Sequence, residues 1–283
     1  ASLGTGLRAP GLDQLSPQIT HNWLMWDPIR QTTLRIQRRG QANLKAEQST
    51  HTSWGFRLEP HPRWTLGADL WHLDVRQTIG YPDPAIQQAA GLMRSDAQGP
   101  YLDAVATNLG RSRKQGIDFD TEWRVPGDAG LIRLSVKGVL YLKSMLKEAA
   151  SGQTVSDLAY FSGITQTVTP RHEVTLGASL ERANWIVMSH LRYRSAYREA
   201  LGWPVLVGTA DEHLSGHMPS HWRWDLGAQW ALNRQWSVSA WLQDATDRGR
   251  TPTLTSASVL QTTEGQSLEN MGRSIKLKAL YRL

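Results

Sequence analysis

Cysteine is absent from the 283-residue chain, which excludes disulfide frameworks and thiolate metal sites. The chain also lacks any apolar run near the roughly 20 residues that a transmembrane helix requires, and its mean hydropathy is negative. These absences exclude a helical membrane protein. They leave open a transmembrane β-barrel, because only every second residue of such a strand faces lipid and the average stays polar.

Phenylalanine is also scarce, with three residues against 13 Trp and seven Tyr. Trp and Tyr favour the interface between membrane and water, where one end of the ring is apolar and the other is wet. The net charge of +6 comes from Lys and Arg spread along the chain beside Asp and Glu, without a nucleic-acid-binding motif. The composition therefore predicts no nucleic-acid partner.

Apolar and polar residues alternate with a period of two through much of the last third of the chain, from Pro170 to Leu283. Successive side chains of a strand point to opposite sides, so each run predicts a ribbon with one apolar and one polar face. The apolar faces include Val174, Leu176, Ala178 and Leu180; Trp185, Val187, Leu191 and Tyr193; Trp222, Trp224, Leu226 and Trp230; Trp236, Val238, Ala240 and Leu242; and Ile275, Leu277, Ala279 and Tyr281.

Over the whole chain the alternation predicts ten strands, joined in turn by short turns and by long segments. Short turns are predicted at 60–62, 126–130, 183–184 and 233–234. Long segments without sustained periodicity cover 11–47, 80–108, 147–169, 199–218 and 249–270. Outer-membrane barrels have short periplasmic turns and long extracellular loops, whereas a soluble sandwich has no reason to keep every second connection long.

Aromatic residues mark both ends of the predicted apolar faces. Those near short turns are Trp64, Trp123, Trp185 and Trp236, and those towards long segments are Tyr193, Tyr197, Trp222 and Trp224. From Trp185 to Tyr197 the chain covers about 40 Å along a strand, and roughly 30 Å across a bilayer once tilted. The sequence therefore predicts an all-β, antiparallel transmembrane β-barrel whose apolar faces contact lipid.

No constellation of residues in the sequence indicates an enzyme. Asp118, Asp120 and Glu122 lie on one predicted strand face, which favours a ladder of ion pairs over a catalytic pair. We predict that Glu122 pairs with Arg133 and Asp118 with Lys137 across a turn. Two further predicted neighbours are Glu173 beside Arg192, and Gly227 beneath Trp241.

His213, His217 and His221 recur every four residues in or beside a long segment. On a helix this spacing could gather the first two around a metal, but Gly216 and Pro219 disfavour a helix there. We interpret these residues as solvated loop histidines and predict no metal site. His213 and His217 are kept as candidate ligand-binding residues.

Five segments of the chain resemble motifs of the TonB-dependent outer-membrane receptors, in the family's order. They are Leu7-Arg8-Ala9-Pro10, similar to "FRAP"; Ala42-Asn43-Leu44-Lys45-Ala46-Glu47-Gln48-Ser49, similar to "NPNLKPE(T/K)S"; Asn108 to Asp118, similar to "N-x-G-x-(S/A)-R-(T/S)-x-G-(V/I)-(D/E)"; Trp224-Asp225-Leu226 with Leu242 to Arg248, similar to "WDL … (V/I)xNLFDR"; and Gly272-Arg273. The resemblance extends over essentially the whole chain.

The resemblance implies that residues 1–283 are the C-terminal portion of a barrel of about 22 strands, of which they would supply about ten. The plug domain and the TonB box of the family are expected to be absent from this segment. The implied function is active uptake of a large, scarce nutrient across the Gram-negative outer membrane. The implied partners are the TonB complex, through the missing N-terminal region, the lipid bilayer, and a small-molecule or metal-chelate ligand.

A ferric siderophore is the first choice of nutrient, with haem, cobalamin or a glycan as the others. His21 lies where haem-transporting members of the family carry a haem-ligating His, and Trp23, Met25 and Trp26 could cover a porphyrin. The candidate ligand-binding residues are thus His21, Trp23, Trp26, His213 and His217, with no resident cofactor. The alternatives are another outer-membrane barrel, either a porin or an autotransporter translocator, and a soluble β-rich binding module.

Overall fold

The computed structural model describes residues 1–27, 32–82, 87, 91–149, 152, 154–161, 169–199, 216–248 and 272–281. Its main element is an antiparallel meander of ten strands, in which each strand pairs with the next along the path. The strands are β1 (Ser2–Arg8), β4 (Glu47–His61), β5 (Trp64–Gly80), β8 (Thr107–Gly127), β9 (Gly130–Glu148), β12 (His172–Arg182), β13 (Trp185–Arg194), β16 (His221–Ala231), β17 (Trp236–Gln243) and β18 (Ser274–Tyr281). The short strand β10 (Thr154–Ser156) adds to β9.

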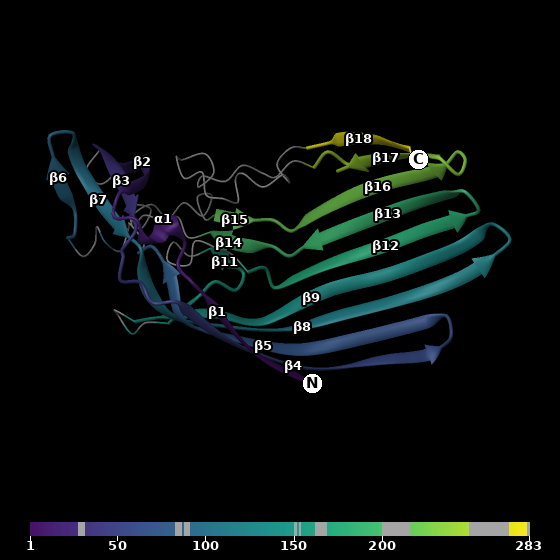
Figure 1. Ribbon diagram of the computed structural model, residues 1–283, viewed down its shortest axis with the longest axis horizontal. Coiled ribbons are helices and arrows are strands. Elements are labelled where there is room, and N and C mark those ends of the chain that lie inside the picture. Colours follow the sequence, from purple (N-terminus) through teal and green to yellow (C-terminus); the bar gives the residue numbers. More distant parts are fainter. Residues whose placement is uncertain are drawn as a thin grey trace.

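The sheet curves into a trough whose hairpin turns gather at one end, on the right of Figure 1. These short connections join β4 to β5, β8 to β9, β12 to β13 and β16 to β17. The predicted alternation of short turns and long connections is confirmed. β18 ends at the same side, because Tyr281 stands opposite Trp236. In the described residues β1 and β18 are the two edges, so this part of the chain does not close into a cylinder.

Strands β4, β5, β8 and β9 are 15, 17, 21 and 19 residues long, and extend well beyond the predicted alternation. The alternation stops near His72, but β5 continues to Gly80. Outside a bilayer neither face of a strand has to be apolar, so the sheet continues without a periodic signal. The segments 11–47, 80–108 and 147–169, which have no sustained periodicity in the sequence, therefore contain strand residues that the alternation did not predict.

Smaller elements fill the long-loop end of the molecule. One sheet has the order β2-β3-β7-β6, from β2 (Ile19–Asp27), β3 (Thr32–Arg39), β7 (Gly99–Val105) and β6 (Arg94–Asp96). It buries Leu34, Ile36, Leu102 and Ala104. The Arg35 guanidinium donates to Asp96 and holds the pKa of that carboxyl below its usual range. The others are α1 (Leu12–Leu15), β11 (Tyr160–Phe161), β14 (Tyr197–Glu199) and β15 (Gly216–Met218).

The outer face of the meander is apolar and exposed. Across four strands, Leu134, Ala178, Ser189 and Leu226 stand in one row, and Val136, Leu176, Leu191 and Trp224 in the next. Leu277 is 78% exposed and Trp54 is 65% exposed. A continuous apolar surface of this size needs an apolar medium, which hydrocarbon chains supply. None of the helices formed by the described residues is long and apolar enough to span a bilayer.

The predicted cross-strand pairs lie on the expected face, but two of the three registers are displaced by two residues. Glu122 stands opposite Ser135, and Lys137 stands opposite Asp120. The predicted pairs imply a turn centred on residues 127–128, whereas the observed turn, within the predicted segment 126–130, centres on 128–129, which moves every pair by two. Glu122 instead accepts a hydrogen bond from Arg124 at 2.6 Å in its own strand.

The hairpin of β12 and β13 shows the same displacement. Its turn lies at residues 183–184 as predicted, but the predicted pair was two residues away from the register that this turn gives, so Glu173 pairs with Arg194, at 3.3 Å, and not with Arg192. The third prediction is confirmed, because Gly227 stands opposite Trp241 and a Cβ there would lie 2.6 Å from the indole. Only glycine allows the Trp241 ring to lie flat over β16.

The family-like motifs form hydrogen-bonded clamps near the long-loop ends of the strands. The Glu47 carboxylate accepts hydrogen bonds from Arg8 Nε at 2.6 Å, Arg8 Nη2 at 2.7 Å and the buried Ile79 N–H at 2.7 Å. Asn108 donates to the carbonyl oxygens of Lys45 and Gln77, both at 2.8 Å. The first three motifs are thus joined to one another in space.

The remaining motifs are joined in the same way. Buried Asp225 accepts from Arg223 Nε and from the Asp244 N–H, both at 2.9 Å. Asp247 accepts from the Arg273 N–H at 2.9 Å. These contacts fasten the connections that follow β17 and precede β18, so the motifs have a structural role in holding the rim.

Replacing Glu47 with alanine should loosen this rim. The substitution leaves the Ile79 N–H buried without its acceptor and removes both Arg8 hydrogen bonds, a loss of about 1–3 kcal/mol. Hydrogen exchange of the full-length protein should show faster exchange at Ile79 than in the wild type. Glu59→Ala, an exposed change in the same strand, should leave that rate unchanged. Equal exchange in both variants would contradict the clamp.

Candidate functional site

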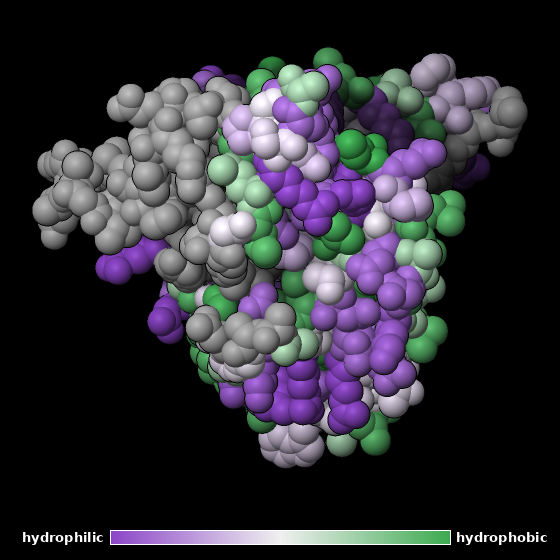
Figure 2. Space-filling model, turned by 90° about the vertical axis from the view of Figure 1, so that its left-hand side faces the viewer, coloured by the Kyte–Doolittle hydropathy of each residue, from purple (hydrophilic) through white to green (hydrophobic). Residues whose placement is uncertain are grey.

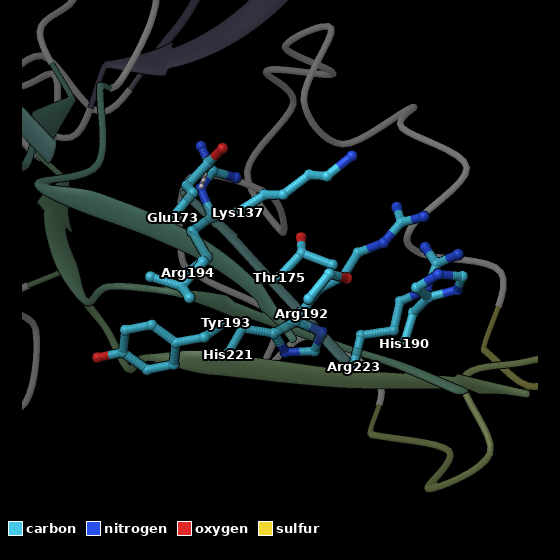
Figure 3. Close-up of a pocket in the computed structure, with 11 residues that line it drawn as sticks. Lys137, Glu173, Thr175, His190, Arg192, Tyr193, Arg194, His221 and Arg223 are labelled. Carbon is cyan, nitrogen blue, oxygen red and sulfur yellow. Dashed lines mark ion pairs between the residues drawn. The ribbon is translucent and has the colours of Figure 1, made fainter. Parts of the chain in front are cut away.

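A cavity of about 490 Å³ lies against the inner face of β9, β12, β13 and β16. Figure 3 shows its side chains extending from these strands. The lining comprises Ser135, Lys137, Glu173, Val174, Thr175, His190, Arg192, Tyr193, Arg194, His221 and Arg223. We call this the basic pocket.

Strand register explains why these residues meet. One row runs straight across four strands through Lys137, Thr175, Arg192 and Arg223. The neighbouring rows contribute Glu173, Arg194 and His221 on one side, and Ser135, Gly177 and His190 on the other. Opposed residues in adjacent strands have Cβ atoms about 5 Å apart. The three cationic side chains of this row, Lys137, Arg192 and Arg223, are therefore gathered on one part of the inner face.

The pocket carries an excess of positive charge. Arg194 lies 3.3 Å from Glu173, which Figure 3 marks as an ion pair. Asp225 lies beneath the row, 2.9 Å from Arg223 and 3.7 Å from Arg192. The four Lys and Arg residues face these two carboxylates, which leaves two positive charges in excess before the two histidines are counted. An arrangement of this kind attracts and orients an anion.

An aromatic pair adjoins the basic pocket on the inner wall. Trp71 and Tyr141 meet edge to face, with ring centroids 5.9 Å apart, and Trp71 Nε1 donates to Asp118 at 2.9 Å. Trp71 lies over Gly116, where a Cβ would come within 2.5 Å of the indole. Tyr141 lies on the same face of β9 two residues after Val139, which stands opposite Glu173. The inner wall therefore offers an aromatic surface beside the cationic row.

Of the five candidate binding residues predicted from sequence, His21 is the one whose side chain belongs to the described residues, and it does not line this pocket. His21 is exposed in β2 opposite Arg38, and its Nδ1 lies 3.3 Å from Thr20 Oγ1. Trp23 and Trp26 belong to β2, where they stand opposite Ile36 and Thr33 of β3, and His217 lies in β15 opposite Arg198. The side chains of Trp23, Trp26 and His217 and the whole of His213 lie outside the described residues.

Of the histidine series noted in the sequence, His221 belongs to the described residues and lines the pocket. Among the described residues, no group of three or more His, Cys, Asp or Glu could hold a metal ion. Sequence reasoning did not select Lys137, Arg192 or Arg223 as binding residues, and it considered the first two only as partners of carboxylates in neighbouring strands. Their meeting depends on a register across four strands that no local pattern reveals.

An antiparallel meander with a lipid-facing exterior and a polar, charged interior is the wall of a transmembrane β-barrel. The chain belongs to the TonB-dependent receptor family, because the family described as "TonB dependent receptor-like, beta-barrel" matches residues 1–244. Barrels of this family reside in the Gram-negative outer membrane and are transport receptors rather than enzymes. Comparison with the curated proteins found no match.

Solved structures share the fold. They include the ferric enterobactin receptor PfeA of Pseudomonas aeruginosa, with a TM-score of 0.62 and 15% identity over 99% of this chain and 37% of that one. The siderophore receptor PirA of Acinetobacter baumannii gives 0.59 and 11% over 99% and 38%. The copper transporter OprC gives 0.58 and 14% over 99% and 36%. The chain thus spans somewhat over a third of the length of these structures.

Proposed function

We propose that this chain is the C-terminal portion of an outer-membrane receptor that takes up an anionic metal chelate, with a ferric siderophore as the first candidate. The TonB complex energises uptake through parts of the receptor outside residues 1–283. The ligand enters from the long-loop side and passes the basic pocket on the inner wall. Localisation in the outer membrane of a Gram-negative cell follows from family membership.

The observation that carries the proposal is the row of Lys137, Arg192 and Arg223 on the inner wall. Ferric iron prefers hard, anionic oxygen ligands, so many of its soluble chelates carry net negative charge. A concave surface with excess positive charge concentrates such anions and raises their rate of encounter. The neighbouring Trp71 and Tyr141 pair suits a chelate with flat, aromatic arms.

The other nutrients fit the pocket less well. A neutral glycan gains nothing from a row of cations and would leave those charges poorly compensated. Haem offers two carboxylates to the row of cations, but most of the porphyrin surface is apolar, whereas the residues that line the pocket are mainly polar or charged. The similar structures include siderophore receptors and a copper transporter, and their low identity to this chain supports only the shared fold.

A ligand series that varies charge tests this proposal. Purified full-length receptor should bind a trianionic ferric tris-catecholate at least about tenfold more tightly than a neutral ferric tris-hydroxamate, measured by titration calorimetry. Added salt should narrow the difference, because screening weakens the attraction. Loss of TonB should abolish uptake by cells and leave binding intact. Tighter binding of the neutral chelate, haem or a glycan would overturn the proposal.

A further inference from the structure

The outer face of β5, β8 and β9 carries a cluster of basic side chains towards the long-loop end. Strand register places Arg76 opposite Arg111, and Arg111 opposite Lys147, so three cations stand in one row. Arg113 and Lys143 lie in the two rows closer to the hairpin turns. We call these five residues the outer basic cluster. They come from positions far apart in the chain, which is why the sequence shows only scattered Lys and Arg.

The cluster begins where the apolar band ends. Leu70, Ile117 and Leu140 form the last apolar row on these strands. Beyond it, the rows read His72, Gln115 and Lys143; then Asp74, Arg113 and Met145; then Arg76, Arg111 and Lys147. Six residues separate Leu70 from Arg76, which is about 20 Å along the strand and roughly 15 Å in height once tilted. The cations therefore occupy the level of lipid headgroups.

Among the described residues, these three rows contain one carboxylate, that of Asp74. Asp74 is buried beside Arg111 and Arg113, with its carboxylate 3.2 Å from Arg113 Nε. The side chains of Arg111 and Arg113 are still 39% and 42% exposed. Five cations against one carboxylate leave four positive charges in excess on this face. Like charges directly opposite one another destabilise a sheet, so a bound counter-anion would relieve the repulsion.

Figure 2 views the molecule from the end at which the long connections lie, and hydrophilic residues gather over the lower part of this view. In Figure 1 the lower side is the one on which β4, β5, β8 and β9 lie. Arg76 and Lys147 are exposed and stand at the far end of the cluster. A ligand for this surface must place anionic groups against the cations and tolerate the apolar band immediately below. A lipid with phosphate groups in its headgroup does both, whereas an acidic soluble protein would have to cover hydrocarbon-facing residues.

We propose that the outer basic cluster binds the phosphate groups of a phosphorylated lipid in the outer leaflet, whose acyl chains lie on the apolar band beneath. Lys143 and Arg113 contact the phosphates nearest the acyl chains. Arg76, Arg111 and Lys147 contact anionic groups further from the membrane centre. The site is separate from the basic pocket, because it occupies the opposite face of the sheet, and it does not depend on which nutrient the receptor carries.

Native mass spectrometry of the full-length receptor in a neutral detergent, titrated with bisphosphorylated lipid A, tests this inference. Arg76→Gln combined with Lys147→Gln should weaken lipid binding about 25-fold, or about fivefold for each cation removed near the headgroups. Both side chains are exposed, and the contacts of Asp74 with Arg111 and Arg113 remain, so the barrel should fold. Arg76→Lys combined with Lys147→Arg keeps the charge and should bind lipid A as the wild type does.

The matched control removes two charges from the inner face, through Lys276→Gln and Lys278→Gln, and should leave lipid affinity unchanged. Dephosphorylated lipid A should bind the wild type at least as weakly as lipid A binds the Arg76→Gln, Lys147→Gln variant, because that variant keeps the phosphate contacts of Lys143 and Arg113. Equal affinity of the wild type for the phosphorylated and dephosphorylated lipids would overturn the proposal. Inorganic phosphate that binds as tightly as lipid A would also overturn it, in favour of a site for a soluble anion.

Discussion

Replacing both Lys137 and Arg192 with glutamine is expected to weaken binding of an anionic ferric chelate about 100-fold. A hydrogen bond to a charged group contributes about 1.5–3 kcal/mol, so the loss of two such contacts corresponds, at the lower end of this range, to roughly two orders of magnitude in Kd. Titration calorimetry of the full-length receptor measures the change directly. The effect should be larger at low ionic strength, where screening of the pocket is weakest.

Arg223 is left in place for a structural reason. It contacts the buried carboxylate of Asp225 at 2.9 Å, and its removal would strip that group of its nearest cation. Such a loss destabilises by several kcal/mol and would confuse weakened binding with misfolding. Lys137 is exposed, and Arg192 lies 3.7 Å from Asp225, so glutamine at these two positions leaves the closest contact of Asp225 intact.

A charge-matched control distinguishes attraction of the chelate by the cations of the basic pocket from attraction by the overall charge of the barrel. Arg57→Gln with Arg133→Gln removes two cations from the inner face away from the pocket, where they form exposed pairs with Asp120 and Glu181. Exposed pairs contribute little to stability, so this variant should fold and bind the chelate within about threefold of the wild type. Equal weakening in both variants would show that net charge, and not the basic pocket, governs affinity.

The lipid-facing half of the fold could be predicted because of one rule: every second residue of a strand that crosses the bilayer faces lipid and is apolar. Runs such as Val174 to Leu180 repeat that rule strand after strand, and the ten strands are where the alternation placed them. Above Leu70 and Leu140 the rule lapses, since water contacts both faces. The long extensions of β5 and β9, and the small sheet around Leu34 and Leu102, consequently left no periodic signal.

Register was harder to predict than face. Moving the centre of a tight turn by one residue shifts each pair by two and keeps all side chains on the same side. Glu122 and Glu173 therefore lie on the predicted face opposite partners two positions from the predicted ones. The basic pocket and the outer basic cluster both depend on register across several strands. Neither could be assembled from patterns within single strands.

The motifs of the sequence indicated the family correctly, but they do not mark the ligand. Glu47, Asn108 and Asp225 hold the rim through hydrogen bonds to neighbouring strands and connections. These hydrogen bonds stabilise the rim in the same way whichever ligand the barrel transports. The cations of the pocket lie between motifs, on strand faces whose alternation tolerates any polar residue. This explains why the family could be recognised from these segments while the binding residues could not.

Replacing Leu176 with arginine should cost about 2–4 kcal/mol of folding stability, the penalty for a cation at the bilayer midplane on a barrel exterior. Leu176 is 41% exposed on the outer face, between Val136 and Leu191 in the neighbouring strands. It stands six residues above Arg182 at the hairpin turn, about 20 Å along a tilted strand and thus near the middle of the apolar band. Urea titration of the full-length receptor in lipid vesicles measures the loss.

The same cation on the other face of the sheet should be tolerated. Gln229 is exposed on the inner face of β16, so Gln229→Arg meets water and should change stability by less than about 0.5 kcal/mol. Leu176→Gln, polar but uncharged, should fall between the two, since its amide also loses water on the outer face. This ordering holds only if hydrocarbon covers the apolar exterior. Equal stability of Leu176→Arg and Gln229→Arg would mean that water, or another protein surface, contacts that side of the sheet.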